Sequence, residues 1–245
     1  MRPISDAQVH GGPVGYEVRD GIAIAHIDNG KANVLSPEVV ELLDRCLTRA
    51  EDSADEVGAL VVTGKPGFLT GGFDLEVMMS GPEAAGMLVT SGGALFARMY
   101  GSAVPVVVAC PGHAVAAGAL MLLAADARVG VAGRFKIGLI ETAKGMVLPR
   151  WAVELAEERL CARHRQEATV GARMYDPEGA VAAGFLDSLV DPEECLDAAL
   201  AEARRWADLP RSAYAGQVTA NRGERLARLE QALAADRGRA FHAGE

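Results

Sequence analysis

Residues 105–123, PVVVACPGHAVAAGALMLL, carry two structural signals in one uncharged stretch. The β-branched residues up to Cys110 predict a buried strand, which Pro111 and Gly112 end. From Ala117 onward, Ala, Leu and Met favour a buried helix. The first backbone N–H groups of a helix have no partner within it, and an unpaired donor among apolar side chains is costly. We therefore expect an oxygen-bearing group at this helix start, and an oxyanion there if the site is catalytic.

Two plainer interpretations apply to the same stretch. A strand, a turn and a buried helix occur in most α/β proteins, so the pattern alone does not establish a site. The uncharged run over residues 102–125 also has the length of a membrane span. This run is interrupted by Pro105, Pro111, Gly112 and His113, which favour a turn within a globular core. We therefore expect no membrane association.

Composition narrows the classes of function. Hydrophobic residues make up 50% of the 245 residues, enough for the core of one domain with or without a small appendage. The net charge of −9 argues against nucleic acid as a general partner. The N-terminal residues lack the apolar core of a signal peptide, and the four cysteines are too far apart for a zinc site or a disulfide framework. We expect a cytoplasmic protein without a bound metal.

Strand and helix patterns alternate up to about residue 132, and helical patterns dominate afterwards. This order predicts an α/β fold with a C-terminal helical region, preceded by a loose arm over residues 1–13. The last helical pattern, over 211–241, has little apolar surface for its length, so we expect it to pack on the body or on a neighbouring subunit. The expected strands cover 14–19, 22–28, 57–63, 105–110, 127–132 and the end of 184–190, and the expected helices cover 37–50, 74–79, 82–100, a segment from 117, 150–171, 177–183 and 192–206.

A glycine-rich loop over residues 64–72 follows the third expected strand. It lacks both the GxGxxG pattern and the GK[ST] of a P-loop, so it gives little support for nucleotide binding. Its glycines are more consistent with a sharp turn or a close approach of the backbone to another group.

Two loops that lead from strands into helices form a more specific pattern, GFLTGGFDLEVM (67–78) and ACPGHAVAAGALMLLAADARVG (109–130). Together with FKIGLIETAKGMVLP (135–149), GKANVLS (30–36) and AVAAGFLDSLV (180–190), they occur in an order that resembles the enoyl-CoA hydratase/isomerase, or crotonase, family. The resemblance extends from about Val14 to Val190.

The resemblance implies a crotonase-like spiral of repeated ββα units over residues 1–190 and a C-terminal helical trimerisation region over 191–245. It implies an enzyme that acts on acyl-CoA thioesters and assembles as a homotrimer or a dimer of trimers. Coenzyme A would enter only as part of the substrate, with no separate cofactor.

In this family two backbone N–H groups hold the thioester oxygen, and by motif position they belong to Phe73 and Ala117. Such donors stabilise the enolate that forms when a proton leaves the carbon next to the thioester. Family hydratases carry two glutamates. One of their positions holds Leu120 here, and the other holds Glu141. The remaining acid/base residue is therefore Glu141, although a surface or ion-paired carboxylate would be the default interpretation without the motif.

The substrate-binding residues implied by the motifs flank these groups. Gly71 and Gly72 precede the first donor, and Lys31 with Ala32 lie in the GKANVLS segment. Glu76 stands where many members carry a lysine near the CoA phosphates, so Lys31 or a C-terminal arginine would have to replace that contact. Met78 and Met87 are the remaining candidates, and we expect them to line the acyl pocket beside Leu120. Methionine at helical spacing is, however, more often a residue of the hydrophobic core.

Three functions stay open at this point. The leading one is an enoyl-CoA isomerase with Glu141 as sole acid/base, because moving a double bond needs one base whereas hydration is well served by two carboxylates. The second is a hydratase that works with one glutamate. The third is a scaffold that binds acyl-CoA without turnover. His113, Asp74 and Asp126 are expected to make structural hydrogen bonds instead of taking part in chemistry.

Overall fold

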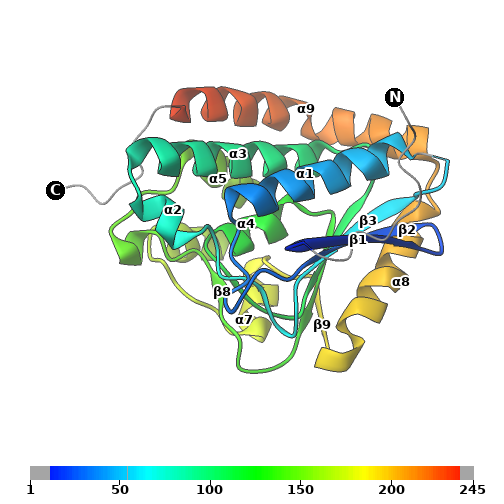
Figure 1. The fold of residues 1–245 in the computed structure, drawn as a ribbon, viewed down its shortest axis with the longest axis horizontal. Coiled ribbons are helices and arrows are strands. Elements are labelled where there is room, and N and C mark those ends of the chain that lie inside the picture. Colours follow the sequence, from blue (N-terminus) through cyan, green and yellow to red (C-terminus); the bar gives the residue numbers. More distant parts are fainter. Residues whose placement is uncertain (1–11, 54, 238–245) are drawn as a thin grey trace.

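The computed structural model describes residues 12–53 and 55–237 of the chain. Its larger sheet contains β1 (Val14–Arg19), β2 (Ile22–Ile27), β3 (Ala59–Thr63), β5 (Val106–Cys110), β7 (Ala127–Val131) and β9 (Ser188–Val190), paired in this order. Of the strand pairs described in this sheet, only β1–β2 is antiparallel, and it forms a hairpin at Asp20-Gly21, a dipeptide that favours such a turn. Figure 1 shows the sheet crossing the molecule beneath the long helices.

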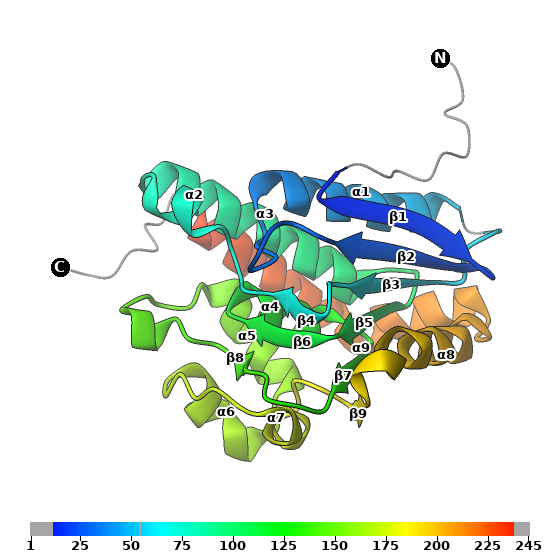
Figure 2. The same cartoon turned by 60° about the horizontal axis from the view of Figure 1, so that its bottom comes forward.

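A second, parallel sheet contains β4 (Gly67–Thr70), β6 (Gly112–Val115) and β8 (Ile137–Gly138). The chain adds one strand to the larger sheet, then one to the smaller sheet, and then forms a helix, three times in succession. Figure 2 shows the two sheets side by side, with β4, β6 and β8 following β3, β5 and β7. This arrangement is the spiral of ββα units expected from the resemblance.

Most of the described helices begin and end close to the expected positions. Ser36 caps the first helix through a side-chain bond to the Val39 N–H, and Asp176 caps another in the same way. The helices are α1 (Pro37–Asp52), α2 (Leu75–Met79), α3 (Pro82–Gly101), α4 (Ala117–Ala124), α5 (Arg150–Arg159), α6 (Ala162–Thr169), α7 (Pro177–Ala183), α8 (Cys195–Ala207) and α9 (Arg211–Asp236), with 3-10 turns η1 (Thr142–Lys144) and η2 (Pro192–Glu194).

The stretch over residues 105–124 lies at the centre of the molecule. Every residue of β5 and every residue of α4 is buried, as the uncharged pattern predicts. The two faces of the larger sheet enter different parts of the core. Leu60 and Val62 pack on the side of α1, α3 and α4, and Val61 faces α8. Burial on both faces explains the near-continuous apolar run of β3.

Three sequence-based expectations are wrong in detail. The sequence predicts a loop over residues 64–72 and, between the strand ending at 110 and the helix from 117, a short connection over 113–116, but these segments contain β4 and most of β6. These strands are short, and they pair with each other across more than forty intervening residues, so local pattern does not reveal them. A Cβ on Gly112 would lie 2.1 Å from the Gly67 carbonyl carbon, so these glycines do permit a close backbone approach. The expected single helix over 150–171 is two helices, because the chain is extended at Leu160 and Cys161.

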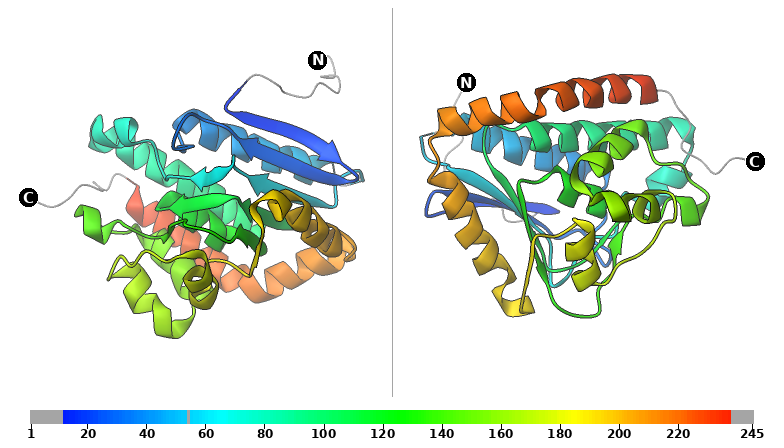
Figure 3. Two further views of the ribbon diagram at one scale, coloured as in Figure 1. Left: turned by 90° about the horizontal axis from the view of Figure 1, so that it is seen from below. Right: turned by 180° about the vertical axis from the view of Figure 1, so that it is seen from behind.

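The C-terminal helices pack on the body of their own chain. α8 lies against β3, β5 and β7, and α9 runs along α3 and α5 (Figure 3). The charged pattern of α9 supplies the contacts, because Arg225 pairs with Glu158 at 2.7 Å and Arg228 with Glu154 at 3.2 Å. The last residues of the expected helix and most of the expected N-terminal arm lie outside the described residues. Among the helices described, none combines the length and the apolar character needed to cross a membrane.

Candidate active site

A cavity of about 340 Å³ lies between the α2–α3 segment, the start of α4 and the chain over 140–151. Of the described residues that line it, only Glu141 and Lys144 are ionisable. Its size and its mainly apolar wall are both typical of small-molecule sites. The apolar side chains of this wall include Leu75, Met78, Val89, Leu120, Val147 and Trp151.

One end of the cavity is formed where the Gly71–Phe73 loop meets the start of α4. A parallel bridge positions the loop, because the Leu35 N–H donates to the Gly72 carbonyl at 2.8 Å and the Asp74 N–H donates to the Leu35 carbonyl at 3.1 Å. In a parallel pairing this leaves the N–H of Phe73 directed away from Leu35. Within residues 12–53 and 55–237, neither the Phe73 N–H nor the Ala117 N–H donates to another backbone oxygen.

The two free donors are held close together. A Cβ placed on Gly72 would lie 3.5 Å from the Ala117 nitrogen and 3.1 Å from the Ala116 Cβ, so the loop touches the start of α4. Gly72 itself has a φ of +106°, which a residue with a side chain adopts only with strain. The loop that carries the Phe73 N–H is therefore in contact with the helix start that carries the Ala117 N–H, as a shared oxygen acceptor would require.

Backbone strain marks the same junction. Ala116 has φ 52° and ψ −118°, a conformation that is costly for any residue with a Cβ. The Ala116 N–H donates to the Gly138 carbonyl at 3.0 Å, which fixes the turn between β6 and α4. Strain of this kind is characteristic of functional sites, and here it sets the direction in which α4 begins.

Glu141 supplies the carboxyl group of the cavity. It precedes η1, and its Oε2 atom is buried without a hydrogen-bond partner among the described residues. Burial raises the pKa of Glu141 to about 7, and the nearby backbone N–H groups of Glu141 and Ile140 offset only part of this rise. A carboxyl group with a pKa near 7 can both accept and return a proton at neutral pH.

Leu120 makes the wall of the cavity at the start of α4 apolar. Its side chain is 2% exposed and lines the cavity one turn of α4 beyond Ala117. The cavity therefore presents one carboxyl group and an apolar side chain where the resemblance places a second carboxylate in hydratases.

Comparison of the sequence with known protein families gives a match that agrees with this site. The sequence profile of the enoyl-CoA hydratase/isomerase family covers residues 17–243 of the chain. The chain belongs to this family.

Individual members of the family show how close the likeness is. The structure of an enoyl-CoA hydratase/isomerase family protein from Pseudomonas syringae is 43% identical, with a TM-score of 0.90 over 93% of this chain and 98% of that one. Human mitochondrial enoyl-CoA delta isomerase 1 is 28% identical over 192 residues, which are 78% of this chain but only 64% of the human protein. A probable enoyl-CoA hydratase from Mycobacterium avium is 30% identical over 199 residues, covering 80% of this chain and 76% of that protein. Similar family members are thus named for two different reactions.

The structure places most of the residues implied by the family motifs around the cavity. Its lining includes Gly71, Phe73, Met78, Leu120 and Glu141. Three further motif residues lie directly behind or beside this lining. The Ala32 carbonyl accepts the Gly71 N–H at 2.8 Å, and Gly72 and Ala117 meet at the junction described above. Lys31 is exposed on the segment next to this loop.

The expectation that Met87 lines the acyl pocket is wrong. Met87 is 63% exposed and lies in a different groove, beside Arg237. Met78 lies on α2 and lines the cavity, whereas Met87 lies on a side of α3 that faces away from it. Val89 is the residue of α3 that reaches the cavity.

Sequence reasoning also missed Trp151, which is fully buried and lines the cavity. A signal for it was present in the Gly92-Gly93 pair, because two glycines inside a helix cost stability unless something packs against them. A Cβ on Gly93 would lie 2.6 Å from the Trp151 ring, and a Cβ on Gly92 would lie 2.4 Å from the Phe73 ring. The glycines thus admit the two aromatic rings on either side of the site.

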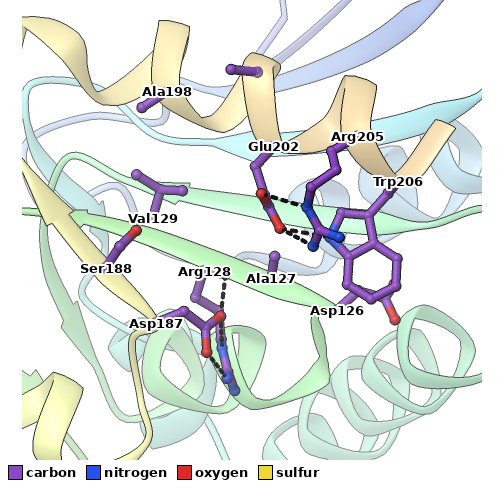
Figure 4. Close-up of a pocket in the computed structure, with 11 residues that line it drawn as sticks. Asp126, Ala127, Arg128, Val129, Asp187, Ser188, Ala198, Glu202, Arg205 and Trp206 are labelled. Carbon is purple, nitrogen blue, oxygen red and sulfur yellow. Dashed lines mark hydrogen bonds and ion pairs between the residues drawn. The ribbon is translucent and has the colours of Figure 1, made fainter. Parts of the chain in front are cut away.

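A second, larger pocket of about 670 Å³ lies between α8 and strands β7 and β9 (Figure 4). It shares no lining residue with the Glu141 cavity. Four of its five charged lining residues pair with one another, and the fifth, Asp126, pairs with Arg222 of α9. Asp187 accepts from Arg128 Nε at 2.9 Å, and Glu202 accepts from Arg205 Nε at 3.1 Å and from Trp206 Nε1 at 2.8 Å. The first pair joins β7 to the residue before β9, and the other contacts lie within α8. Because these groups already have partners, we assign the chemistry to the Glu141 cavity.

Proposed function

We propose that the protein is an enoyl-CoA isomerase that moves a double bond from C3 to C2 of the acyl group. The observation that carries this proposal is the single buried carboxyl group, Glu141, in a cavity otherwise lined by apolar groups and Lys144. Leu120 occupies the position where a second carboxylate would be needed to hold water.

The proposed reaction uses two groups of this chain. The thioester oxygen accepts hydrogen bonds from the backbone N–H groups of Phe73 and Ala117. Glu141 removes a proton from C2, the electron pair of that C–H bond delocalises onto the thioester oxygen, and a dienolate forms. Glu141 then returns the proton to C4, and the double bond is left between C2 and C3. The two N–H donors stabilise the charge on the dienolate oxygen, and donors of this kind contribute about 3–4 kcal/mol each in other enzymes.

Hydration with a single glutamate is the second candidate, because the relatives are named for both reactions. Hydration requires a water molecule that is positioned and deprotonated while the α-carbon receives a proton. Leu120 offers that water no hydrogen-bond partner, which favours the isomerase. A scaffold without turnover is disfavoured by the retained carboxyl group of Glu141 and by its pKa of about 7.

The test is to incubate the pure protein with a 3-enoyl-CoA and, separately, with a 2-enoyl-CoA, and to separate the products by chromatography. We expect 2-enoyl-CoA from the first substrate and little 3-hydroxyacyl-CoA from the second. Rapid hydration of the 2-enoyl-CoA would assign the hydratase activity instead. A folded protein that binds both esters and converts neither would be a scaffold.

A further inference from the structure

Lys144 is the one cation among the described residues that line the acyl cavity. It ends the 3-10 turn η1, in which its N–H donates to the Glu141 carbonyl at 2.9 Å. Residues three apart in a 3-10 helix lie on the same side, so Lys144 and Glu141 project toward the same space. Gly145 follows with a φ of +72°, a left-handed conformation that closes the turn after Lys144.

The Lys144 ammonium has no ion pair and no side-chain hydrogen bond among the residues described. Lys65, in contrast, donates to Asp28 at 3.3 Å and to the Gly30 carbonyl. Lys144 is exposed, and its long stem can lie along the apolar wall while its charge stays at the water-facing edge. An unpaired ammonium at this edge is available to a ligand.

The net negative charge of the chain gives the Lys144 ammonium a further role in binding an anionic ligand. The chain carries a net charge of −9, which repels an anionic ligand at long range. Glu141 adds to that repulsion whenever it is ionised. A cation beside the cavity offsets both effects where the ligand enters.

We propose that Lys144 binds an anionic group of the thioester substrate at the edge of the acyl cavity. The inference rests on the proposed function, because it requires that this cavity hold an acyl thioester. Two sources could supply the anion, a phosphate of coenzyme A or a carboxylate at the far end of the acyl chain. An ammonium group binds either one as a point charge.

The experiment measures dissociation constants by calorimetry for three saturated esters that cannot react: hexanoyl-CoA, hexanoyl-pantetheine and adipoyl-pantetheine. The first carries phosphates, the second carries no anion, and the third carries only a terminal carboxylate. The proteins are the natural chain, Lys144→Met, Lys144→Arg and the control Lys136→Met, whose lysine is exposed and does not line the cavity.

We expect Lys144→Met to weaken binding of one anionic ester by roughly 1.5-fold to fivefold, the range for an exposed charge contact. Lys144→Arg should restore most of that loss, and Lys136→Met should bind all three esters normally. A loss confined to hexanoyl-CoA identifies the phosphates, and a loss confined to adipoyl-pantetheine identifies the acyl carboxylate. Added salt should reduce either difference.

Equal weakening of all three esters would overturn the proposal, because the lysine would then act by packing and not by charge. Unchanged binding of all three esters would overturn it as well. A natural protein that is folded and binds none of the esters would overturn the proposed function itself, and the role of Lys144 with it. Failure of the inference alone is thus distinguishable from failure of the function.

Discussion

The Glu141 carboxyl group lines an apolar cavity with its Oε2 atom buried, and its raised pKa has consequences for activity. The base must be ionised to remove a proton, so kcat/KM should rise with pH through about 7 and then level off. A pH–rate profile with a saturable 3-enoyl-CoA measures this directly. An unshifted glutamate would give a profile that is already flat above pH ~5.5, which would contradict the assigned environment.

The same shift predicts how stability depends on pH. The native state binds the Glu141 proton more tightly than the unfolded state, so this group contributes stability that is fully present below about pH 4.5 and is lost as pH rises through about 7. Glu141→Gln removes that loss and should therefore be more stable than the natural protein at pH 8, by about 1–3 kcal/mol in urea unfolding.

Gly72 tests the geometry of the oxyanion site. A methyl group there would press on the Ala116 Cβ and the Val115 carbonyl oxygen, both at 3.1 Å, and would displace one donor from the other. We expect Gly72→Ala to lower kcat by about tenfold to a hundredfold. Gly67→Ala is the matched control, because Gly67 also has a positive φ, +88°, but a Cβ there would meet nothing within 4 Å. Equal loss of kcat in both variants would show that backbone strain alone is responsible.

At the level of elements, α4 is fixed at both ends. Its N-terminal end lies against the Gly72 loop, and Asp126 follows its C-terminal end. The buried Asp126 carboxylate accepts from Arg222 of α9 at 2.6 Å, from the Tyr214 hydroxyl at 3.0 Å and from the Val106 N–H at 2.8 Å. Arg159 of α5 donates to the Leu123 carbonyl at 3.1 Å, so neighbouring helices hold the end of α4. The helix that begins at the proposed oxyanion donor, Ala117, is thereby joined to the C-terminal region.

Arg222→Met should test this connection. The substitution leaves the Asp126 carboxylate buried beside Tyr214 without its cation, which costs about 3–5 kcal/mol. Arg228→Met removes an exposed pair with Glu154 and should cost at most about 1 kcal/mol. Urea unfolding of the two variants gives both values. Similar losses in the two variants would show that the buried pair has no special weight.

The sequence predicted the elements with local signals and missed those without them. The buried strand and helix around residues 105–124 were evident from composition, and Ser36-Pro37 placed the start of α1. Strands β4 and β6 were missed because their pairing depends on contacts distant in sequence. At the site, the family motifs single out Glu141, which does line the cavity, whereas Met87 does not, because no local signal shows which side of α3 faces the cavity.

At the level of the whole molecule, α9 packs on its own chain and leaves other apolar surface uncovered. Exposed apolar side chains lie on both sides of the active-site cavity, on α2–α3 and on the segment from η1 to α6. Monomers rarely leave large apolar areas open to water, and the family resemblance implies trimers. We therefore expect a particle of three or six copies in sedimentation equilibrium. A stable monomer at micromolar concentration would contradict this expectation. The exposed apolar side chains on the two sides of the cavity are Leu75, Met79, Met87, Val147, Val153 and Val170.

The central claim is that Glu141 alone moves the proton from C2 to C4. Glu141→Gln keeps the size of the side chain and removes the base, so the most direct measurement is its kcat for a 3-enoyl-CoA alongside its affinity for the saturated ester. We predict that binding stays within about threefold of the natural protein while kcat falls by at least about a thousandfold. A Glu141→Gln variant that binds the ester normally and still isomerises the 3-enoyl-CoA at a comparable rate would contradict the claim.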